Sequence, residues 1–563
     1  MADHMVPAKF DIIFFLIIFI GKGYSTEYKN TPFDTISAKI DSIFSGLVSG
    51  EMPGYQIAVT KEGRIIYSRS FGFANLDEGI SITTKTIFHV ASVSKQFTAF
   101  AIWLLAKQGK LNLDDDVRKY LDYFPDFGKK ITIRQLINHT SGLRDQWELL
   151  MMSGVRLDDV IKQEHIIKIL SRQKELNFEP GEEYLYCNSG YTLLAEVVSK
   201  VSGMDFCEFT KENIFQPLGM NNSHFHIDHE EIVRNRALSY YKDDSGKYKY
   251  SVLSYANVGA TSLYTNAEDL CNWINNFFTG VVGGKVEIKQ MYERGILKSG
   301  DTIDYAMGVV VGSYKGYKLI QHSGSDAGFR TQVAWFPEKE IGIVILGNQD
   351  NLIPYTIYYN IADILLPQKT GYTSAPKKEI KAYNMSTEEL NKFAGTYFES
   401  AGRVAEIKTD NGSLMIQING SPFYNIIPLS EDKFFLKAAG LDINFDVDKN
   451  GNVNGLNYVA GKVRNEFMKF EPYKINPGEL NEFAGRYYSD ELSTFYDIDV
   501  SGENVIVKHI RNSDLILSVI AKDVFRGNAE WLSVLKFYRD SNGIIKGFRI
   551  TGNRARNVLF TKQ

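Results

Sequence analysis

FHVASVSK, residues 88–95, is the stretch of this sequence from which the fold assignment starts. Ser92 and Lys95 stand three residues apart, where an apolar run predicts a helix from about Ala91 to about Gly109. Residues at this spacing share one helix face, so their side chains can hydrogen-bond. The N-terminus of a helix adds unpaired N–H groups and positive potential, which favour negative charge developing near the serine. The stretch therefore indicates a serine nucleophile with a lysine that handles its proton.

By itself, a Ser-x-x-Lys pattern is a weak signal. A lysine acts as a base only when it is neutral, and with a pKa of about 10.4 roughly one molecule in 2,500 is neutral at pH 7. Burial and nearby cations must therefore depress its pKa. Ser92 is distinguished by its place at the start of an apolar helix, because the same pattern recurs at Ser171/Lys174, Ser239/Lys242, Ser374/Lys377, Ser430/Lys433 and Ser533/Lys536.

Two further motifs complete a possible site. In Tyr186-Cys187-Asn188, a phenol could carry a proton and an amide could hold a peptide group of the substrate. His322-Ser323-Gly324 is predicted at the end of the strand YKLIQ, where an edge backbone and a glycine would let a substrate pair closely. Each motif is weak alone, because Tyr-x-Asn recurs elsewhere and a lone histidine at a strand end is more often structural.

The surrounding sequence predicts a mixture of helices and antiparallel strands. A hairpin over residues 55–75 opens the first domain, with its turn at Lys61-Glu62-Gly63. Helical patterns follow over Gly190–Val201 and Ala267–Phe277. Three short strands that suggest a meander, and then a closing helix, are predicted over Tyr317–Gln321, Gln332–Phe336, Ile341–Leu346 and Asn351–Leu366.

Taken together, the three motifs resemble the serine β-lactamase and penicillin-binding protein family, especially its class C-like, D-aminopeptidase-like branch. That family uses the same order of Ser-x-x-Lys, Tyr-x-Asn and a [Lys/His]-x-Gly strand. The resemblance covers roughly Pro32 to Leu366. Its supporting phrases are IRQLINHTSGL at residues 133–143, EPG at 179–181 and QPLGM at 216–220.

The resemblance implies a fold and an acyl-enzyme mechanism. The fold is an α/β (α+β) β-lactamase/transpeptidase-like domain over residues 32–370, with an antiparallel sheet flanked by helices. Ser92 attacks a carbonyl, and Lys95 and Tyr186 shuttle the proton, with the choice of base left open. The implied substrate-binding residues are Asn188, His322, Gly324 and Ser325, with the backbone N–H groups of Ser92 and Ser325 as the oxyanion hole; His139 is interpreted as structural.

The C-terminal part of the chain repeats itself. LNKFAGTY at residues 390–397 returns as LNEFAGRY at residues 480–487. A linker over 371–378 and two copies of one all-β module, over 379–471 and 472–563, are the economical explanation. The strand spacing predicts small antiparallel barrels. This arrangement resembles that of D-aminopeptidases, in which two lipocalin-like barrels follow the catalytic domain.

Composition and the N-terminal sequence bear on the partners, the disulfides and the location of the protein. With 63 basic and 67 acidic residues, the net charge of -4 gives no indication of a nucleic-acid partner. Three cysteines are too few for a disulfide framework. Lys9 followed by the apolar run Phe10–Ile20 predicts a signal peptide over residues 1–25. The expected location is therefore secreted or periplasmic, with cell-wall association or membrane attachment through an uncleaved leader as alternatives.

Two other motifs are interpreted as decoys. Lys369-Thr370-Gly371 matches the third β-lactamase motif literally but follows the closing helix, so it is assigned to the linker. His224, His226, Asp228 and His229 reproduce the H-x-H-x-D-H pattern of metallo-β-lactamase-like zinc hydrolases. Because later histidines in suitable contexts are lacking, the stretch is interpreted as a solvated surface loop. Catalytic zinc and adventitious metal binding remain alternatives, and no metal or other cofactor is predicted.

The leading function is a serine hydrolase that acts on amides or esters near a D-residue. His322 in place of the lysine that attracts the substrate carboxylate in many β-lactamases disfavours a β-lactamase. D-aminopeptidase stands ahead of DD-peptidase and esterase, because the tandem β modules agree with the D-aminopeptidase architecture. A class C-like β-lactamase or carboxylesterase, a non-catalytic penicillin-binding or sensing protein, and a zinc hydrolase remain alternatives. The expected partner is a small peptide, β-lactam or ester. The oligomeric state and the role of the β modules remain open.

Overall fold

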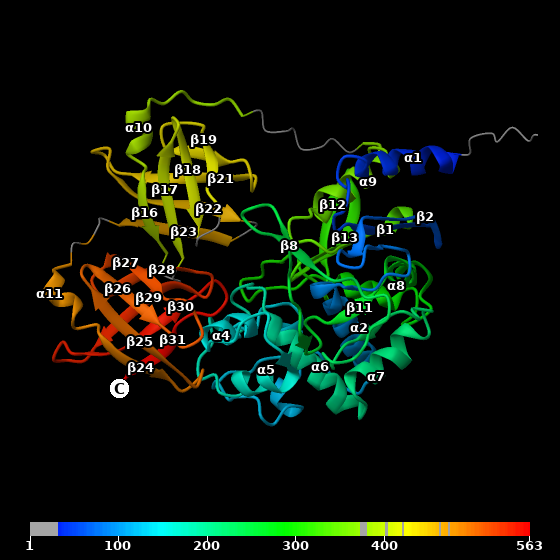
Figure 1. The fold of residues 1–563 in the computed structure, drawn as a ribbon, viewed down its shortest axis with the longest axis horizontal. Helices are drawn as coiled ribbons and strands as arrows, with labels where there is room; N and C mark the ends of the chain where they lie inside the picture. The colour runs from blue at the N-terminus through cyan, green and yellow to red at the C-terminus, as the bar shows by residue number, and fades with distance from the viewer. Residues whose placement is uncertain are drawn as a thin grey trace, which may run out of the picture.

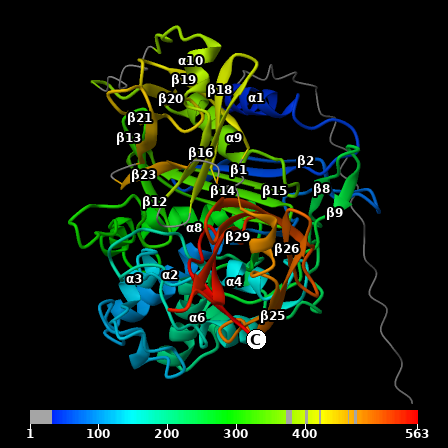
Figure 2. The ribbon, with the colours of Figure 1, turned by 90° about the vertical axis from the view of Figure 1, so that its left-hand side faces the viewer.

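The computed structural model describes residues 32–371, 380–399, 403–418, 422–460, 463–470, 473 and 475–563. The predicted signal peptide lies outside these residues, as does the predicted linker apart from Gly371. Within the described ranges, none of the helices combines the length and apolar character that crossing a membrane requires. Figures 1 and 2 show an α/β domain at the N-terminal side followed by two barrels, which confirms the predicted fold class.

A six-stranded antiparallel sheet forms the centre of the N-terminal domain. Its strand order is β12-β13-β14-β15-β1-β2. The predicted hairpin and meander are both confirmed, the first as β1–β2 and the second as β13–β14–β15. The strands are β1 (Tyr55–Lys61), β2 (Arg64–Phe71), β12 (Val310–Tyr314), β13 (Tyr317–Asp326), β14 (Phe329–Phe336) and β15 (Ile341–Gly347).

Helices cover both faces of this sheet. Successive side chains of a strand point to opposite faces, and β1 shows the consequence. Ile57 and Val59 pack with α1 (Pro32–Phe44) and α9 (Pro354–Leu365), whereas Ala58 belongs to the core on the opposite face. That second core contains α2 (Ser94–Lys107) and α8 (Ala267–Thr279). Both faces of the sheet are therefore buried, which explains why the inner strands read as continuous apolar runs.

Shorter elements connect these layers. One three-stranded sheet has the order β5-β11-β7 and lies next to the nucleophile segment, because β5 ends three residues before Ser92. The remaining helices are α3 (Ile133–Ile137), α4 (Gln146–Met152), α5 (Gln163–Leu170), α6 (Asn188–Ser202) and α7 (Phe206–Thr210). The short strands are β3 (Phe73–Asn75), β4 (Ile80–Ser81), β5 (Phe88–His89), β6 (Ile161–Lys162), β7 (His224–Phe225), β8 (Tyr240–Lys242), β9 (Tyr248–Tyr250), β10 (Tyr255–Ala256) and β11 (Leu263–Thr265).

Each C-terminal module is a closed eight-stranded antiparallel barrel preceded by a short helix. The first contains α10 (Thr387–Asn391), β16 (Gly395–Phe398), β17 (Val404–Asp410), β18 (Ser413–Ile418), β19 (Tyr424–Pro428), β20 (Lys433–Leu436), β21 (Leu441–Val447), β22 (Val453–Ala460) and β23 (Val463–Phe470). The second contains α11 (Pro477–Leu480), β24 (Gly485–Ser489), β25 (Thr494–Ser501), β26 (Asn504–Lys508), β27 (Leu515–Ala521), β28 (Val524–Ala529), β29 (Leu532–Arg539), β30 (Ile545–Thr551) and β31 (Val558–Lys562).

The repeated phrase has the same structural role in both barrels. Gly395 and Gly485 open the first strand of each barrel with φ angles of 145° and 143°, which a residue with a Cβ rarely adopts. Two residues later, the hydroxyl of Tyr397 donates to the carbonyl oxygen of Phe393 at 2.7 Å, and Tyr487 makes the equivalent bond at 2.7 Å. The sequence repeat is therefore a structural repeat.

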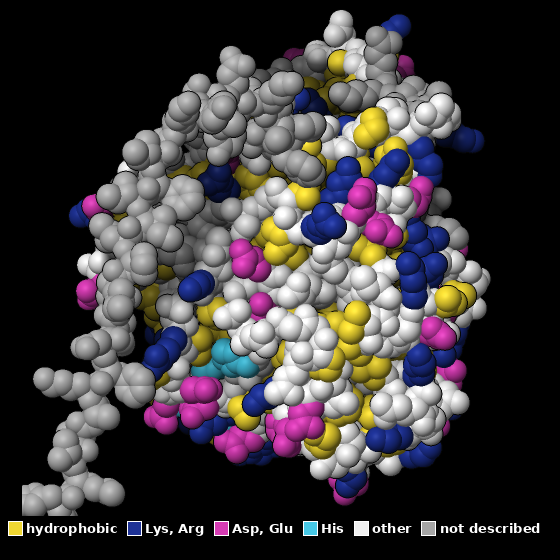
Figure 3. Space-filling model, turned by 90° about the vertical axis from the view of Figure 1, so that its right-hand side faces the viewer, with side chains coloured by type: hydrophobic (Ala, Val, Ile, Leu, Met, Phe, Trp, Pro, Cys, Tyr) yellow, Lys and Arg dark blue, Asp and Glu magenta, His cyan; other side chains and the backbone are white. Residues whose placement is uncertain are grey.

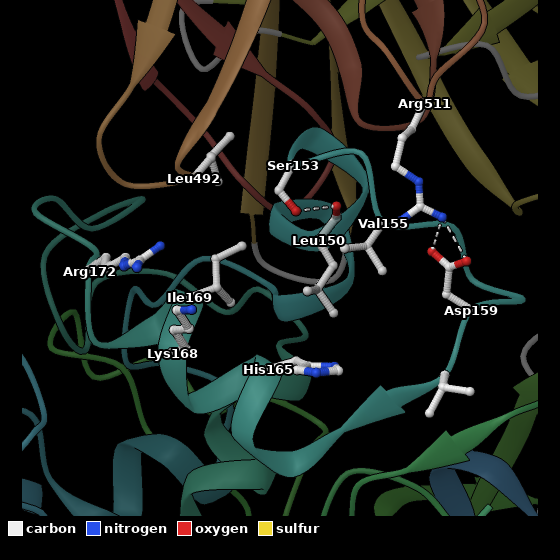
Figure 4. Close-up of a pocket in the computed structure, with 11 residues that line it drawn as sticks. Leu150, Ser153, Val155, Asp159, His165, Lys168, Ile169, Arg172, Leu492 and Arg511 are labelled. Atoms are coloured by element: carbon white, nitrogen blue, oxygen red, sulfur yellow. Dashed lines mark hydrogen bonds and ion pairs between the residues drawn. The ribbon is translucent and has the colours of Figure 1, made fainter.

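The second barrel, not the first, shares its apolar core with the N-terminal domain. In Figure 1 it lies beside α4 and α5. Figure 4 shows a cavity of about 430 Å³ at this contact, with Ile169 on one side and Leu492 and Arg511 of the barrel on the other. Arg511 Nη2 pairs with Asp159 at 2.7 Å across it. This docking depends on contacts between residues far apart in the chain, such as Asp159 and Arg511, and no sequence motif predicted it.

Candidate active site

Ser92 lies on a sharp turn between β5 and α2. Ala91 has a φ of 49°, in the left-handed region that residues with a Cβ seldom occupy. The chain then forms a 3₁₀ turn over Ala91–Val93, and α2 begins at Ser94. The predicted helix start at Ala91 is therefore three residues early, because the backbone at Ala91 interrupts the regular helix. This turn projects Ser92 from the start of a buried helix.

Three acceptors surround the Lys95 amine. Nζ donates to Ser92 Oγ at 3.1 Å, to Asn188 Oδ1 at 2.8 Å and to the carbonyl oxygen of Ala260 at 2.7 Å. The amide and carbonyl oxygens can only accept, whereas the hydroxyl can also donate. A neutral Lys95 would therefore keep its two other bonds and accept the proton of Ser92. The arrangement therefore allows a proton to pass from Ser92 Oγ to Lys95 Nζ.

Asp145 sets the orientation of the Asn188 amide. Asp145 Oδ2 accepts from the backbone N–H of Asn188 at 2.7 Å and from its Nδ2 at 2.8 Å. Asp145 also caps α4, because its Oδ1 accepts from the backbone N–H of Trp147 at 3.0 Å. With Nδ2 held in this way, Oδ1 faces Lys95. Asp145 is thus a positioning residue for the site.

Burial lowers the pKa of Lys95 to about 7. The side chain is 0% exposed, and loss of hydration disfavours its charged form. The carboxylates of Asp326 and Asp145 oppose this effect, and the Arg554 guanidinium adds to it. With a pKa near neutrality, roughly half of the amine is unprotonated at pH 7.

Tyr186 lies against the same amine. Lys95 Nζ is 5.0 Å from the centre of the Tyr186 ring. The phenol hydroxyl is buried and has no hydrogen-bond partner among the described residues. Burial raises the pKa of Tyr186 well above its usual value, and the nearby Ser92 hydroxyl offsets only part of this. The phenol therefore stays protonated at neutral pH.

His139 supports Tyr186 from behind. Their ring centres are 4.2 Å apart, and His139 Nδ1 accepts the backbone N–H of Cys187 at 3.0 Å. Burial, reinforced by the nearby Lys95, holds the pKa of His139 well below its usual value. A neutral ring packed behind the phenol agrees with the structural role expected from the sequence.

His322 lies inside β13 rather than at its end, because the strand continues to Asp326. Its Nδ1 is 2.6 Å from the carbonyl oxygen of Ser323, and the Tyr305 hydroxyl is 3.0 Å from its Nε2. A carbonyl can only accept, so Nδ1 carries the proton and Nε2 accepts from Tyr305. Burial lowers the pKa of His322 to about 4, which makes the ring neutral at pH 7.

The second half of β13 faces the nucleophile. β12 pairs only with Tyr317–Gln321, so one edge of His322–Asp326 is left without a strand partner. Gly324 lies against the turn that carries Ser92, because a Cβ added to it would be 2.2 Å from the carbonyl oxygen of Val90. The structure thus brings the edge of β13 and the predicted site residue Ser325 next to the nucleophile turn.

The N-terminal domain matches a known family model. The model, described as Beta-lactamase, matches residues 40–366. The chain belongs to the beta-lactamase family. This is a family of serine hydrolases that also includes penicillin-binding proteins and D-aminopeptidases. A second model, described as a domain of unknown function (DUF3471), matches residues 380–473, which cover the first barrel.

Curated members of the beta-lactamase family align with both the catalytic and the barrel regions. The chain is 28% identical over 463 residues to penicillin-binding protein 4* of Bacillus subtilis, covering 78% of this chain and 98% of that protein. It is 28% identical over 451 residues to a D-aminopeptidase of Brucella anthropi, covering 78% and 79% of the two chains.

Solved structures show the same fold. The octameric penicillin-binding protein homologue from Pyrococcus abyssi has a TM-score of 0.53 and 26% identity, covering 78% of this chain and 100% of that one. A class C β-lactamase has a TM-score of 0.50 at 21% identity, covering 61% and 100%. At that identity the likeness supports the fold alone.

The second barrel reaches the β-lactamase domain close to the site. The buried carboxylate of Glu148 on α4 accepts the backbone N–H groups of Arg554 and Ala555 at 2.8 and 2.7 Å. The backbone N–H of Asp145 donates to the carbonyl oxygen of Arg554 at 3.0 Å. The barrel therefore holds the helix whose capping residue orients Asn188.

Sequence reasoning missed these supporting residues. Asp145 could be recognised as a helix cap, but its bond to Asn188 joins positions 43 residues apart. The buried His89, three residues before Ser92, contacts Asp326 at 2.9 Å, and neither was singled out. His89 could have been recognised from the sequence, because it lies in the stretch FHVASVSK that carries the nucleophile. No sequence feature pointed to Asp326 as its partner.

Both predicted decoys lie on segments other than the one that carries Ser92. Lys369 follows α9 and pairs with Glu338 at 2.5 Å. The interpretation of the H-x-H-x-D-H stretch as a solvated loop is wrong for its first part. His224 belongs to β7, and the next histidine, His226, is 1% exposed, because β11 covers this segment.

Replacing Gly324 with alanine is expected to slow acylation of Ser92 by about 100-fold. The added methyl group would overlap the Val90 carbonyl and push β13 away from the nucleophile turn, and a misplacement of about 1 Å costs this much. Labelling of Ser92 by a fluorophosphonate, followed by intact-protein mass spectrometry, measures the rate. Gly312→Ala on β12 is the matched control, because nothing lies within 4 Å of its added Cβ. Equal labelling rates in both variants would contradict the placement of β13.

Proposed function

We propose that this protein is a serine hydrolase that forms an acyl-enzyme with amides or esters next to a D-residue, most closely as a D-aminopeptidase or DD-peptidase. One observation carries the proposal. The buried amine of Lys95 is held between Ser92 Oγ and two oxygens that can only accept. A lysine in this arrangement can take the serine proton and return it, which is the chemistry that an activated nucleophile needs.

Lys95 is the general base in this proposal. Ser92 Oγ attacks the substrate carbonyl carbon, and its proton passes to Lys95 Nζ. Tyr186 begins protonated, because burial raises its pKa, and its phenol lies near the Ser92 hydroxyl, so it suits the role of acid. It gives its proton to the leaving amine or alkoxide and regains one from Lys95. Water then attacks the acyl-enzyme by the reverse route, releasing the acid and restoring Ser92.

The pKa values support this division of roles. A good base has a pKa near the working pH, and that of Lys95 is about 7. The phenol of Tyr186 would have to ionise in a buried place, where its pKa lies well above 10. Less free energy is therefore needed to obtain the neutral amine of Lys95 than the phenolate of Tyr186, which makes the lysine the better base.

The oxyanion hole is proposed at the backbone N–H groups of Ser92 and Ser325. Ser325 follows Gly324, the residue that touches the nucleophile turn. The free edge of His322–Asp326 would pair with the backbone of an extended peptide substrate. Each oxyanion donor typically contributes about 2.7–4 kcal/mol to the transition state.

The preference for aminopeptidase over β-lactamase chemistry rests on charge. His322 is neutral, because both ring nitrogens are engaged and burial lowers its pKa to about 4. It therefore offers no fixed cation to a substrate carboxylate. Arg554, which does carry charge nearby, lies 3.8 Å from Asp145 and 3.8 Å from Glu530, which offset it. The relative named D-aminopeptidase agrees with this preference.

A panel of substrates tests the proposal. It contains D- and L-amino-acid p-nitroanilides, D-Ala-D-Ala peptides, short acyl esters and nitrocefin, each measured with the wild type and Ser92→Ala. The expected result is turnover of D-configured amides that the variant lacks. Faster turnover of nitrocefin than of any D-amide would overturn the substrate class. Stable acylation of Ser92 without product release would instead indicate a penicillin-binding or sensing protein and overturn the hydrolase.

A further inference from the structure

We propose that His224, His226 and Glu231 form a zinc-binding site, separate from the Ser92 site and not part of the hydrolytic reaction. Their potential ligand atoms all lie within 4.8 Å of one another. The site stands on β7, at the opposite edge of the β5-β11-β7 sheet from the strand that leads to Ser92.

Strand geometry points both histidines to the same side. Residues i and i+2 of an extended segment share a face. His224 and His226 flank Phe225, which packs against Phe206 and Phe215 in the core. The ladder continues through His226, whose backbone N–H donates to the carbonyl oxygen of Ser262 at 2.9 Å. The two imidazoles are thus held side by side, with ring centres 5.8 Å apart.

The histidine nitrogens are buried without partners. His226 is 1% exposed, and neither of its ring nitrogens has a hydrogen-bond partner among the described residues. His224 Nε2 is also buried and unpartnered. Buried polar groups normally have partners, because an unsatisfied one costs about 1–3 kcal/mol. A bound cation would satisfy one nitrogen of each imidazole, and no described residue hydrogen-bonds these atoms.

Glu231 returns to the histidines through a turn. Asp228 makes this turn: its Oδ1 accepts the backbone N–H of Glu230 at 2.9 Å, and its carbonyl accepts that of Glu231 at 3.1 Å. Glu231 Oε2 then lies 3.6 Å from His226 Nδ1. This explains why the glutamate, and not the Asp228 or His229 of the sequence pattern, completes the cluster.

Two imidazoles and one carboxylate are ligands typical of zinc. Tetrahedral bonds of about 2.0–2.1 Å place ligand atoms roughly 3.4 Å apart, so the present separations need movements of about 1 Å. The Glu231 side chain, 57% exposed, is free to make them. A cavity of about 480 Å³ lined by His224 and Glu231 leaves room for water as the fourth ligand. On the face drawn in Figure 3, histidine side chains reach the surface beside a group of acidic side chains.

The proposed site would brace the segment beside the nucleophile. Tyr264 on β11 lies opposite His224 on one side and opposite His89 of β5 on the other. A metal clip on β7 would therefore tie the loop of residues 226–235 to the sheet that supports the Ser92 turn. This role predicts an effect on stability rather than on the chemical step.

Zinc titration of the full chain, without a histidine tag and after removal of metal by a chelator, tests the site. Isothermal titration calorimetry is expected to give one Zn²⁺ per chain, and Co²⁺ in its place is expected to give the visible absorption of a low-coordinate site. The thermal midpoint should rise by a few degrees with Zn²⁺. Glu231→Gln is expected to weaken binding at least tenfold, and His226→Gln to abolish it.

The controls separate this cluster from nonspecific binding. His229→Gln, a change in the same motif but outside the cluster, is expected to bind like the wild type, as is Ser92→Ala. Because His226 is buried and its variant can fail to fold, His224→Gln gives a second test of the histidines. The proposal is overturned if the wild type shows no saturable binding, or if Glu231→Gln and His224→Gln both bind as tightly as the wild type.

Discussion

Lys95→Met is expected to reduce the rate of Ser92 acylation by about 10⁴-fold, or about 5.4 kcal/mol in the transition state. Methionine fills a similar volume in the buried site but cannot accept a proton. Asn188 Oδ1 and the Ala260 carbonyl would lose their donor, while Ser92 would keep its place on the turn before α2. Labelling by a fluorophosphonate and hydrolysis of the best panel substrate measure the loss. Lys107→Met, an exposed position in the last turn of the same helix, is the control and should keep the wild-type rate.

The pH profile distinguishes loss of a base from loss of packing. The wild-type rate should rise about tenfold per pH unit up to about pH 7 and then level, because only the neutral amine accepts the proton and burial lowers its pKa to about 7. Lys95→Met should lose this rising limb, and Lys95→Arg should not restore it, because arginine stays charged. If Lys95→Met acylates within tenfold of the wild type and keeps the limb, the base is another group.

Local pattern was enough to predict the main elements of the fold. Alternating and continuous apolar runs gave the hairpin of β1 and β2 and the meander of β13 to β15. The repeated phrase around Gly395 and Gly485 predicted two equal barrels, because the same turn geometry requires the same residues. Each of these signals lies within a few residues of the element it predicts.

Contacts between distant segments could not be predicted in this way. His226 resembles a loop residue in the sequence, and only the pairing of β7 with β11, about forty residues later, buries it. Asp145 likewise resembles an ordinary helix cap until Asn188 is folded against it. The three motifs for the site were recognisable because their residue types and order carry the chemistry, whereas the groups that orient them depend on tertiary contacts.

The contact between the second barrel and the β-lactamase domain also consists of contacts between distant segments that local sequence pattern does not predict. The fully buried side chain of Arg144 pairs with the buried Glu491 of the barrel at 2.6 Å. Its other donors reach Gln173 and the carbonyl oxygens of Arg556 and Asn557. The next residue is Asp145, which orients Asn188. A charge pair at this place therefore couples docking of the barrel to the geometry of the site.

Arg144→Met is expected to lower the free energy of unfolding of the docked protein by about 3–5 kcal/mol, because it leaves the Glu491 carboxylate buried without its partner. Thermal unfolding and limited proteolysis between the domains measure the effect. Arg549→Met is the matched control: it breaks a partly exposed pair with Glu175 in the same interface, and such pairs contribute less than about 1 kcal/mol.

Replacing both partners, in Arg144→Met/Glu491→Leu, should recover part of this loss of stability, because a buried apolar pair no longer carries an unpaired charge.

The single variant Arg144→Met should also acylate Ser92 more slowly than Arg549→Met, since undocking releases Glu148 and Asp145 from the backbone of Arg554. Slower acylation that returns in the double variant would tie the barrel to the site through this contact. A single variant as stable as Arg549→Met would show that Glu491 is hydrated or protonated, and that the barrel docks without the pair.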